Sequence, residues 1–478
     1  EEEGTATMAV LTEAPAPVRA PATAPRRRVT TPRWWRDAVG AATWASMLVV
    51  VALWVAGGGL QAMGTAGGAL TSLGRITGLV AADLLLVQVL LMARIPVVER
   101  SYGQDELARR HRLVGFWSFS LMLAHLVLIA AGYAVTAGIN PFVQFWEMVV
   151  DYPGMLLATA GTALIVMVAL TSLRRARRKL RYESWHLLHL YAYLGVGLAI
   201  PHMLWTGQEF LASPVATAYW WTLWIAAAGS ILVWRVGVPL VRSLVHDVRV
   251  ERVVREGPDV VSVVMSGRGL DRLPMSAGQF MNWRFLSGPG WTRAHPYSLS
   301  AAPTDTTLRV TVKDLGDGSH ALASVRPGAR VLFEGPYGRL HAGVRTRRGV
   351  TLVASGIGIS PLRALLEDLD QRPGEVTLLY RARSEADLVL RGEIERLAAR
   401  TGARVYYLVG RRIAGRHSWL PEAAAHLSDE QALLALVPDI AAHDVFVCGA
   451  TGWMDAVEKA ALAAGVPAAN IHTERFSW

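Results

Sequence analysis

Cysteine is nearly absent from this sequence. Cys448 is the only cysteine in 478 residues, so the chain can form neither an intrachain disulfide nor a cysteine-ligated zinc or iron–sulfur site. An acidic loop of the EF-hand type is also lacking, which argues against calcium control within the chain. The formal net charge is +10, yet no motif of a nucleic-acid-binding module accompanies it. We therefore expect no nucleic-acid partner.

Charged residues are scarce in long stretches of the first half. Six apolar runs there are long enough to cross a bilayer, and short β-like runs with Gly and Pro between them follow. The runs cover residues 38–56, 73–93, 112–135, 153–173, 185–204 and 217–240. We predict a disordered tail at 1–33, a six-helix transmembrane bundle at 34–243, a β-barrel at 244–345 and an α/β domain at 346–478.

The start of the chain and its basic residues set the expected topology. Met8 is a candidate native start, which would make residues 1–7 a non-native remnant. Arg and Lys cluster before the first run, between the second and third, and between the fourth and fifth. The opposite segments carry only Glu147, Asp151 and Glu209. The positive-inside rule then predicts a cell-membrane protein with both termini in the cytoplasm.

Four histidines lie in two of the apolar runs. His111 and His125 are 14 residues apart in the third run, and His189 and His202 are 13 apart in the fifth. At about 1.5 Å of rise per residue, each pair spans roughly 20 Å of an apolar layer about 30 Å thick. A buried imidazole is costly unless it binds a group or faces a partner. The four predict two stacked haems, held by His111 with His189 and by His125 with His202.

Two residues leave alternatives open in this half. A 13-residue step misses the starting direction of a helix by about 140°, so the fifth helix needs a distortion, for which Pro201 is the candidate. His186 is the alternative inner ligand. Arg75, near the outer end of the second helix, is interpreted as an unpaired cation. It either snorkels to the interface or lies beside the outer haem, where it would hold a propionate or stabilise a reduced acceptor.

These residues resemble the ferric reductase and NADPH oxidase family of transmembrane flavocytochromes. The resemblance rests on six helices, the H-x13-H spacing and the stretch HLYAYLGVGLAIPH. It implies two b-type haems on the four histidines and an arginine near the outer haem at Arg75. Animal oxidases of the family place a further histidine one turn beyond the outer ligand, and Ile129 stands there instead. This departure argues against an animal-type arrangement for oxygen reduction.

The β-like region carries a second resemblance, to ferredoxin-reductase-like flavoproteins. Its signature is the stretch His295-Pro296-Tyr297-Ser298, and it implies that Ser298 contacts the ring of FAD and that Tyr297 lines its edge. Downstream, a cation, a Gly turn and a hydroxyl are candidates for the FAD pyrophosphate, although a plain turn explains the glycines equally well. These residues are Lys313, Gly318 and Ser319. The stretch Gly335-Pro336-Tyr337-Gly338 matches the family's link between its flavin and nucleotide domains.

The last segment has the pattern of a nucleotide-binding domain. A strand runs into Gly356, Gly358 and Pro361 and then into an amphipathic helix, a context in which a helix N-terminus holds a pyrophosphate. The next strand ends in Arg381, Arg383 and Ser384 rather than in an acidic residue. Cations there favour the 2′-phosphate of NADPH over NADH.

The end of the chain supplies the remaining candidates. Cys448 and Gly449 resemble the family's motif beside the nicotinamide, with a buried structural thiol as the alternative. The family also places a near-terminal aromatic over the flavin, for which Trp478 is the first choice and Phe476 the second. The order of the segments predicts electron transfer from NADPH through FAD and two haems to an outer acceptor. Dioxygen is the first choice of acceptor, a ferric chelate the second, and a partner protein or quinone the third.

Overall fold

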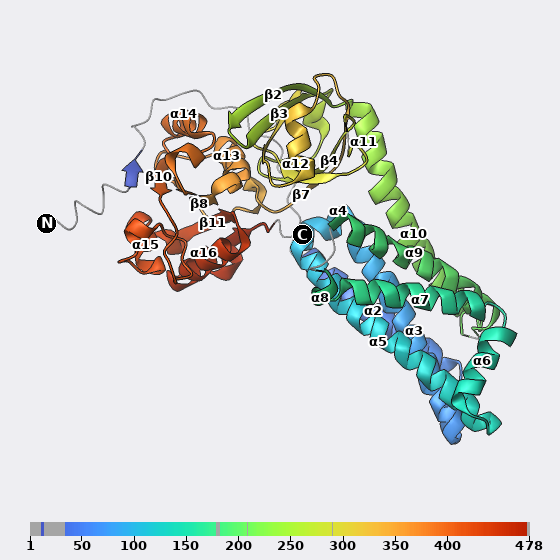
Figure 1. Cartoon of the computed structure of the whole chain (residues 1–478). Coiled ribbons are helices and arrows are strands. Elements are labelled where there is room, and N and C mark those ends of the chain that lie inside the picture. Colours follow the sequence, from blue (N-terminus) through green and yellow to red (C-terminus); the bar gives the residue numbers. More distant parts are fainter. Residues whose placement is uncertain (1–10, 14–33, 178–181, 208, 289, 476–478) are drawn as a thin grey trace. The chain divides into compact units, whose positions relative to one another are not determined.

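The computed structural model describes residues 11–13, 34–177, 182–207, 209–288 and 290–475. Two compact units divide the chain (Figure 1). The helical unit comprises residues 33–102 and 106–235, and the sheet unit comprises residues 1–32, 103–105 and 236–477.

Within the described residues, six helices are long and apolar enough to span a membrane, which confirms the count of six expected from the apolar runs. They are α2 (Trp34–Ala56), α3 (Ala66–Met92), α5 (Gln104–Ala137), α7 (Met155–Ser172), α9 (Tyr182–Trp205) and α10 (Pro214–Ser230), the last continuing through a π-helical segment into α11 (Val238–His246). Three short helices connect them: α4 (Pro96–Tyr102), α6 (Pro141–Asp151) and α8 (Arg174–Arg177).

Small residues set how closely the helices α7 and α9 approach each other. A Cβ added at Gly161 of α7 would stand 2.5 Å from the carbonyl oxygen of Gly195 on α9, and one added at Gly195 would stand 2.8 Å from that of Gly161. Such close backbone approach is how membrane helices gain packing when lipid offers no hydrophobic advantage. These two glycines therefore position the histidine-bearing helix α9.

A buried polar cluster joins three further helices of this unit. Asp83 of α3 is fully buried, and its Oδ1 accepts hydrogen bonds from the hydroxyls of Ser46 on α2 at 2.5 Å and of Tyr219 on α10 at 2.7 Å. Buried polar groups are stable only when they find partners. The cluster therefore fixes α2 and α10 against the face of α3 that carries Asp83.

In the sheet unit, the expected β-barrel is two three-stranded antiparallel sheets, ordered β2-β3-β6 and β5-β4-β7. Single isolated bridges, Arg249 to Arg330 and Leu299 to Val310, join their edges, so no continuous ladder closes a barrel. Side chains of both sheets form one apolar core that includes the fully buried Trp283. The strands are β2 (Arg249–Gly257), β3 (Val260–Ser266), β4 (Phe280–Phe285), β5 (His295–Ser298), β6 (Thr307–Lys313) and β7 (Val331–Tyr337), with the short helix α12 (Asp317–His320) after β6.

The rest of the sheet unit is a six-stranded sheet of order β1-β10-β9-β8-β11-β12, parallel except for β1. Leu11–Glu13, within the expected disordered tail, form the edge strand β1. Apolar clusters cover both faces, with α13 and α14 packed in one and α15 and α16 in the other. The elements are β8 (Gly349–Ser355), α13 (Ile359–Asp368), β9 (Val376–Ala382), α14 (Arg391–Thr401), β10 (Arg404–Val409), α15 (Asp429–Leu436), β11 (His443–Cys448), α16 (Thr451–Ala463) and β12 (Ile471–Thr473).

Asp444, at the start of β11, connects three segments of this sheet. Its Oδ2 accepts hydrogen bonds from the backbone N–H groups of Thr346 and Arg347, both at 2.6 Å, before β8. Its Oδ1 accepts from Asn470 at 2.9 Å and faces His472 of β12 at 3.0 Å. Burial by itself would raise the pKa of Asp444, but these hydrogen bonds outweigh burial and hold the pKa well below its ordinary value.

We expect Asp444→Asn to lower the free energy of unfolding of the sheet unit by about 3 kcal/mol. The substitution replaces one of the two acceptor oxygens by an NH2 group, whose hydrogens would face N–H donors in a buried site. The pKa of Asp444 is lowered in the folded state. The carboxylate therefore contributes fully to the free energy of unfolding above about pH 4, and this contribution is lost as pH falls below that. Tryptophan fluorescence during chemical unfolding of the full chain in detergent, from pH 7 to pH 3, measures both effects. The control is Asp439→Asn, since Asp439 is 67% exposed and should contribute about 1 kcal/mol or less. Equal losses in both variants would contradict the prediction.

Candidate functional site

The four histidines occupy two helices, His111 and His125 on α5 and His189 and His202 on α9. The ring centroids of His111 and His189 lie 6.0 Å apart, with the ring planes at 66°. Two metal–imidazole bonds of about 2.0 Å each, together with the ring radii, span about 6 Å. His125 and His202 lie on the same two helices and form the second candidate pair. The spacing of the first pair therefore fits one iron between His111 and His189.

The Nδ1 nitrogen lies near a hydrogen-bond partner in three of the four histidine rings. The Nδ1 atoms of His111 and His125 lie 3.3 Å and 2.8 Å from the carbonyl oxygens of Gln88 and Gly74 on α3. A carbonyl oxygen only accepts, so each Nδ1 carries the hydrogen and Nε2 is left as the basic nitrogen. Metal-ligating histidines usually have their other nitrogen held by such a partner.

His189 and His202 complete the set in different ways. The Nδ1 atom of His189 lies 3.4 Å from the Ser172 hydroxyl at the end of α7. Among the residues that the structure describes, the Nδ1 of His202 is a buried ring nitrogen without a hydrogen-bond partner. His202 therefore lacks, among the described residues, the Nδ1 partner that the other three histidines have. The four residues thus fit two haems, whereas the described residues contain no cluster of three or more His, Cys, Asp or Glu side chains that could hold a metal ion.

Glycines of α3 make room for His125, a feature that the sequence analysis missed. A Cβ at Gly78 would stand 2.5 Å from the Nδ1 of His125, and a Cβ at Gly74 would stand 2.9 Å from Ile129. The glycine spacing of four residues places both positions on one helix face. This spacing was the available signal for the surface against which α5 packs.

Arg75 is not the unpaired cation that the sequence predicted. Its guanidinium forms an ion pair with the carboxylate of Glu209, which lies between α9 and α10. The side chain of Arg75 is 26% exposed and that of Glu209 is 10% exposed. Burial raises the pKa of Glu209, and this effect exceeds the opposing effect of the Arg75 charge. A charge at a membrane face needs a partner, and this partner is too distant in sequence for a local pattern to reveal it.

The flavin-signature residues form β5, where Pro296 lies opposite Asn282 of β4. The rings of His295 and Tyr297 stack at 6.0 Å, and a Cβ at Gly318 would stand 2.3 Å from the His295 ring. Burial raises the pKa of Tyr297, so its hydroxyl stays protonated. The hydroxyl of Ser298 is buried and has no hydrogen-bond partner in the described part of the chain. This orphaned hydroxyl fits a flavin ring atom as its partner.

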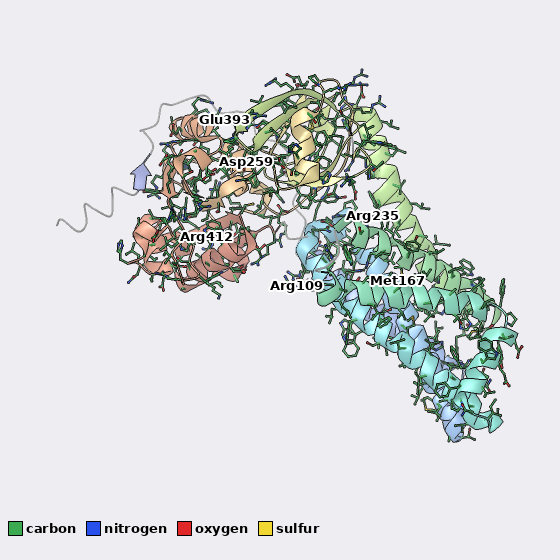
Figure 2. All side chains as sticks on the ribbon, in the orientation of Figure 1. Arg109, Met167, Arg235, Asp259, Glu393 and Arg412 are labelled. Carbon is green, nitrogen blue, oxygen red and sulfur yellow. The ribbon has the colours of Figure 1, made fainter. Side chains whose placement is uncertain are left out.

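Two candidates for the FAD pyrophosphate have other partners. The ammonium group of Lys313 pairs with the carboxylate of Asp259, labelled in Figure 2, at 3.1 Å. The hydroxyl of Ser319 accepts hydrogen bonds from the backbone N–H groups of Leu315 and Gly316 and thereby closes its own turn. Both roles in cofactor binding stay predictions.

The linking stretch ends β7 and approaches a carboxylate that the sequence analysis missed. Gly335 and Gly338 adopt positive φ angles, of 139° and 92°. A Cβ at Gly338 would stand 2.2 Å from the carboxylate of Glu474, so only glycine fits there. Pro336 follows Gly335, and the hydroxyl of Tyr337 donates to Glu334 at 2.7 Å. The available signal for Glu474 was its place just before the terminal aromatic residues.

The nucleotide candidates meet at one edge of the parallel sheet. A Cβ at Gly358 would stand 2.2 Å from the Cys448 carbonyl oxygen, and one at Gly449 would stand 2.9 Å from Ser355. Gly356 has a φ of 54°, and Pro361 lies in the first turn of α13. The carboxyl ends of the parallel strands β8 and β11 thus face the start of one helix, where an α/β sheet binds nucleotides.

The thiol of Cys448 is buried at this edge. Burial and then the negative charge of Glu474 raise its pKa, so the thiol stays neutral and is no nucleophile. Cys448 thus places a small polarizable group at this edge, and the expected position of Cys448 and Gly449 beside the nicotinamide stays a prediction. The terminal aromatics Phe476 and Trp478 lie outside the described residues.

The cations after β9 differ in their availability. Arg381 is buried, and its guanidinium donates to the carbonyl oxygens of Leu408 at 3.1 Å and Arg411 at 3.0 Å. Burial and then the charge of Arg412 lower the pKa of Arg381 to about 10. Arg383 is exposed, as is Arg412 in the loop after β10, labelled in Figure 2. The sequence analysis missed Arg412 because only the sheet order brings β10 beside β9.

Ser384, the third residue predicted there, is also engaged locally. Its hydroxyl donates to the Asp387 carboxylate at 2.7 Å, and the two side chains form a reciprocal cap of the following helical turn. Asp387 is thus held four residues beyond Arg383, within this cap.

Family models match both halves of the chain. One described as "Ferric reductase like transmembrane component" matches residues 77–200, and one described as "Oxidoreductase NAD-binding domain" matches residues 352–459. The chain is similar to the crystal structure of the FAD/NAD-binding domain of nitric oxide dioxygenase from Vibrio cholerae, at 27% identity and a TM-score of 0.39, over 48% of this chain and 98% of that one.

Curated relatives are reductase components. "3-Ketosteroid-9-alpha-monooxygenase, ferredoxin reductase component" of Mycolicibacterium smegmatis is 34% identical over 49% of this chain and 66% of its own length. "Ferredoxin--NADP reductase B" of Sorangium cellulosum is 32% identical over 42% of this chain and 84% of its own length. The chain spans 56% to 66% of the length of the first three relatives. The chain is therefore an NAD(P)H-dependent oxidoreductase that joins a ferric reductase-like transmembrane component to an FAD- and NAD-binding module belonging to the ferredoxin–NADP reductase family.

Proposed function

We propose that this protein transfers electrons from cytoplasmic NADPH, through FAD and two b-type haems, to dioxygen at the outer face of the cell membrane. The observation that carries the proposal is the opposed pair His111 and His189, 6.0 Å apart between two membrane helices. When bound, FAD supplies the conversion of a two-electron hydride transfer into single electrons, and the haems supply the passage of these electrons across the apolar layer. The chain supplies binding, orientation and electrostatics.

The residues of each site have separate tasks. The backbone carbonyls of Gly74 and Gln88 orient the two α5 imidazoles, so that the basic nitrogens face α9. Ser298 offers a buried hydroxyl to the flavin ring. Gly358 lets the backbone around Cys448 approach the nucleotide, and the buried thiol helps exclude water from the nicotinamide.

A ferric chelate is the second candidate acceptor. Ile129 occupies the position where the animal oxidases of the family carry a histidine, and it packs against Gly74, whose carbonyl holds His125. This apolar neighbour offers no proton or hydrogen bond to a bound oxygen species. The presence of Ile129 at this position is the observation that favours a ferric chelate as the electron acceptor.

The central experiment starts with the purified full-length protein, supplied with haem and FAD. NADPH is added without oxygen, and the haem absorption spectrum is recorded before and after air or ferric citrate is supplied. We expect two low-spin haems to be reduced by NADPH and reoxidised faster by oxygen than by the chelate. A preparation that was adequately supplied with haem and shows no haem spectrum would sink the proposal.

The ligand assignment is tested by single substitutions. We expect about two haems per FAD in the unaltered protein and about one in His111→Leu or His202→Leu, because each change removes one of two axial nitrogens. His186→Leu is the matched control on the same helix as His202 and should keep both haems. The pyridine haemochrome assay measures the stoichiometry. Loss of a haem in His186→Leu would instead make His186 the inner ligand.

Nucleotide selectivity is expected to depend on the exposed cations rather than on Arg381. We predict that Arg383→Ala and Arg412→Ala each lower kcat/KM for NADPH about tenfold and leave that for NADH nearly unchanged, because a charge-assisted hydrogen bond to the 2′-phosphate is lost. Both kcat/KM values are measured by steady-state kinetics, in which NADPH or NADH reduces an artificial electron acceptor through the flavin of the sheet unit. Arg400→Ala, on the exposed face of α14, is the control. Equal use of NADH and NADPH by the unaltered protein would refute the preference.

A further inference from the structure

Arg75 and Glu209 form a charge pair at the outer end of the helical unit. Arg75 directly follows Gly74, whose carbonyl oxygen accepts the hydrogen bond of His125. It therefore lies at the level of the outer histidine on α3. A guanidinium at this level would attract anions to the place where electrons leave. Its ion pair with Glu209 cancels that attraction, because the pair carries no net charge.

Glu209 is held in place by its neighbours. Phe210, the next residue, is buried and stacks on the buried Trp220 of α10, with ring centroids 5.0 Å apart. Thr206 donates to the Pro153 carbonyl oxygen at 2.7 Å, and Ser213 caps α10. The segment between α9 and α10 is therefore anchored on both sides of the carboxylate.

The packing around Glu209 also brings its second oxygen against another helix end. A Cβ at Gly57, just after α2, would stand 2.9 Å from the Glu209 Oε2. The absence of a side chain at Gly57 leaves the space that the carboxylate fills. Arg75 remains 26% exposed, so the guanidinium would be open to an anion from outside if Glu209 were not paired with it.

We propose that Glu209 is a specificity residue that masks Arg75, so that the outer site accepts an uncharged acceptor in preference to an anionic metal chelate. The inference rests on the proposed function and adds the charge class of the acceptor. The step is a one-electron reduction supplied by NADPH: dioxygen becomes superoxide, or a ferric chelate becomes the ferrous chelate. No bond to the protein is made or broken. Glu209 and Arg75 act on the approach and affinity of the acceptor.

The test compares Glu209→Gln with the unaltered full-length protein. We expect the ratio of reoxidation by ferric citrate to reoxidation by oxygen to rise about three- to tenfold at low ionic strength, because an unmasked cation attracts the chelate. The gain should shrink towards 1 M salt, where charges are screened beyond about 3 Å. An unchanged ratio, or a gain independent of salt, would overturn the inference.

A binding measurement is independent of turnover. Gallium citrate has the charge of ferric citrate and accepts no electron, so equilibrium dialysis gives its Kd directly. We expect Glu209→Gln to tighten binding about three- to tenfold. Glu147→Gln removes one negative charge from the exposed surface of α6 and leaves Arg75 paired. Equal tightening in both variants would assign the effect to the general surface charge and overturn the masking of Arg75.

The double variant Arg75→Gln/Glu209→Gln keeps the test decisive if Glu209→Gln folds poorly. It removes both charges, so we expect gallium citrate to bind as weakly as to the unaltered protein. Tight binding by the double variant would contradict the inference, since no cation is then left to unmask. Failure of the unaltered protein to show reducible haem would count against the proposed function, whereas normal haem reduction with unchanged chelate selectivity would count against the role of Glu209 alone.

Discussion

An imidazole buried in an apolar layer is stable only when its polar atoms have partners, and the helical unit is arranged around this constraint. The Nδ1 atoms of His111 and His125 are satisfied by carbonyl oxygens of α3, which leaves Nε2 as the basic nitrogen of each ring. That pairing requires α5 to lie close to α3, and Gly74 and Gly78 permit it. His202, which directly follows Pro201 in α9, breaks the pattern, because its Nδ1 has no partner among the residues that the structure describes.

The sheet unit depends on a different constraint, the common direction of its parallel strands. Because β8 and β11 run side by side in the same direction, Gly358 and Cys448 meet at their carboxyl ends. The opposite end of β11 is held by Asp444, whose carboxylate connects the segment before β8 with β12. Stability and nucleotide binding are thus assigned to opposite ends of one strand.

Charge is used in contrasting ways at the two ends of the proposed electron path. At the strand ends, Arg381 is engaged with carbonyl oxygens while Arg383 and Arg412 are exposed, which leaves cations available to an anionic nucleotide. At the outer end, Glu209 neutralises Arg75. A net cation suits a phosphate, and a neutral pair suits an uncharged acceptor. Arginine therefore favours an anionic ligand where its charge is exposed and an uncharged ligand where a carboxylate neutralises it.

Local patterns in the sequence determined much of the architecture. Apolar length alone predicted the six membrane helices, and the strand–glycine–helix pattern predicted the nucleotide edge, because both signals are carried by neighbouring residues. The histidine spacing also predicted which helices face each other. The way the two three-stranded sheets meet and the partner of Arg75 were not foreseen for the same reason, because both concern contacts between distant segments.

Only the tertiary structure decided which groups have partners. Hydrogen bonds and ion pairs between residues far apart in the chain leave no periodic trace, so Glu209, Glu474 and Arg412 could not be assigned from the sequence. The sequence likewise could not reveal that the guanidinium of Arg381 donates to the backbone carbonyl oxygen of Arg411. The sequence by itself determined the elements and their order, since these follow from periodicity and turn chemistry. The charge state of the outer site was decided by packing, because a buried charge takes whichever partner the fold brings to it.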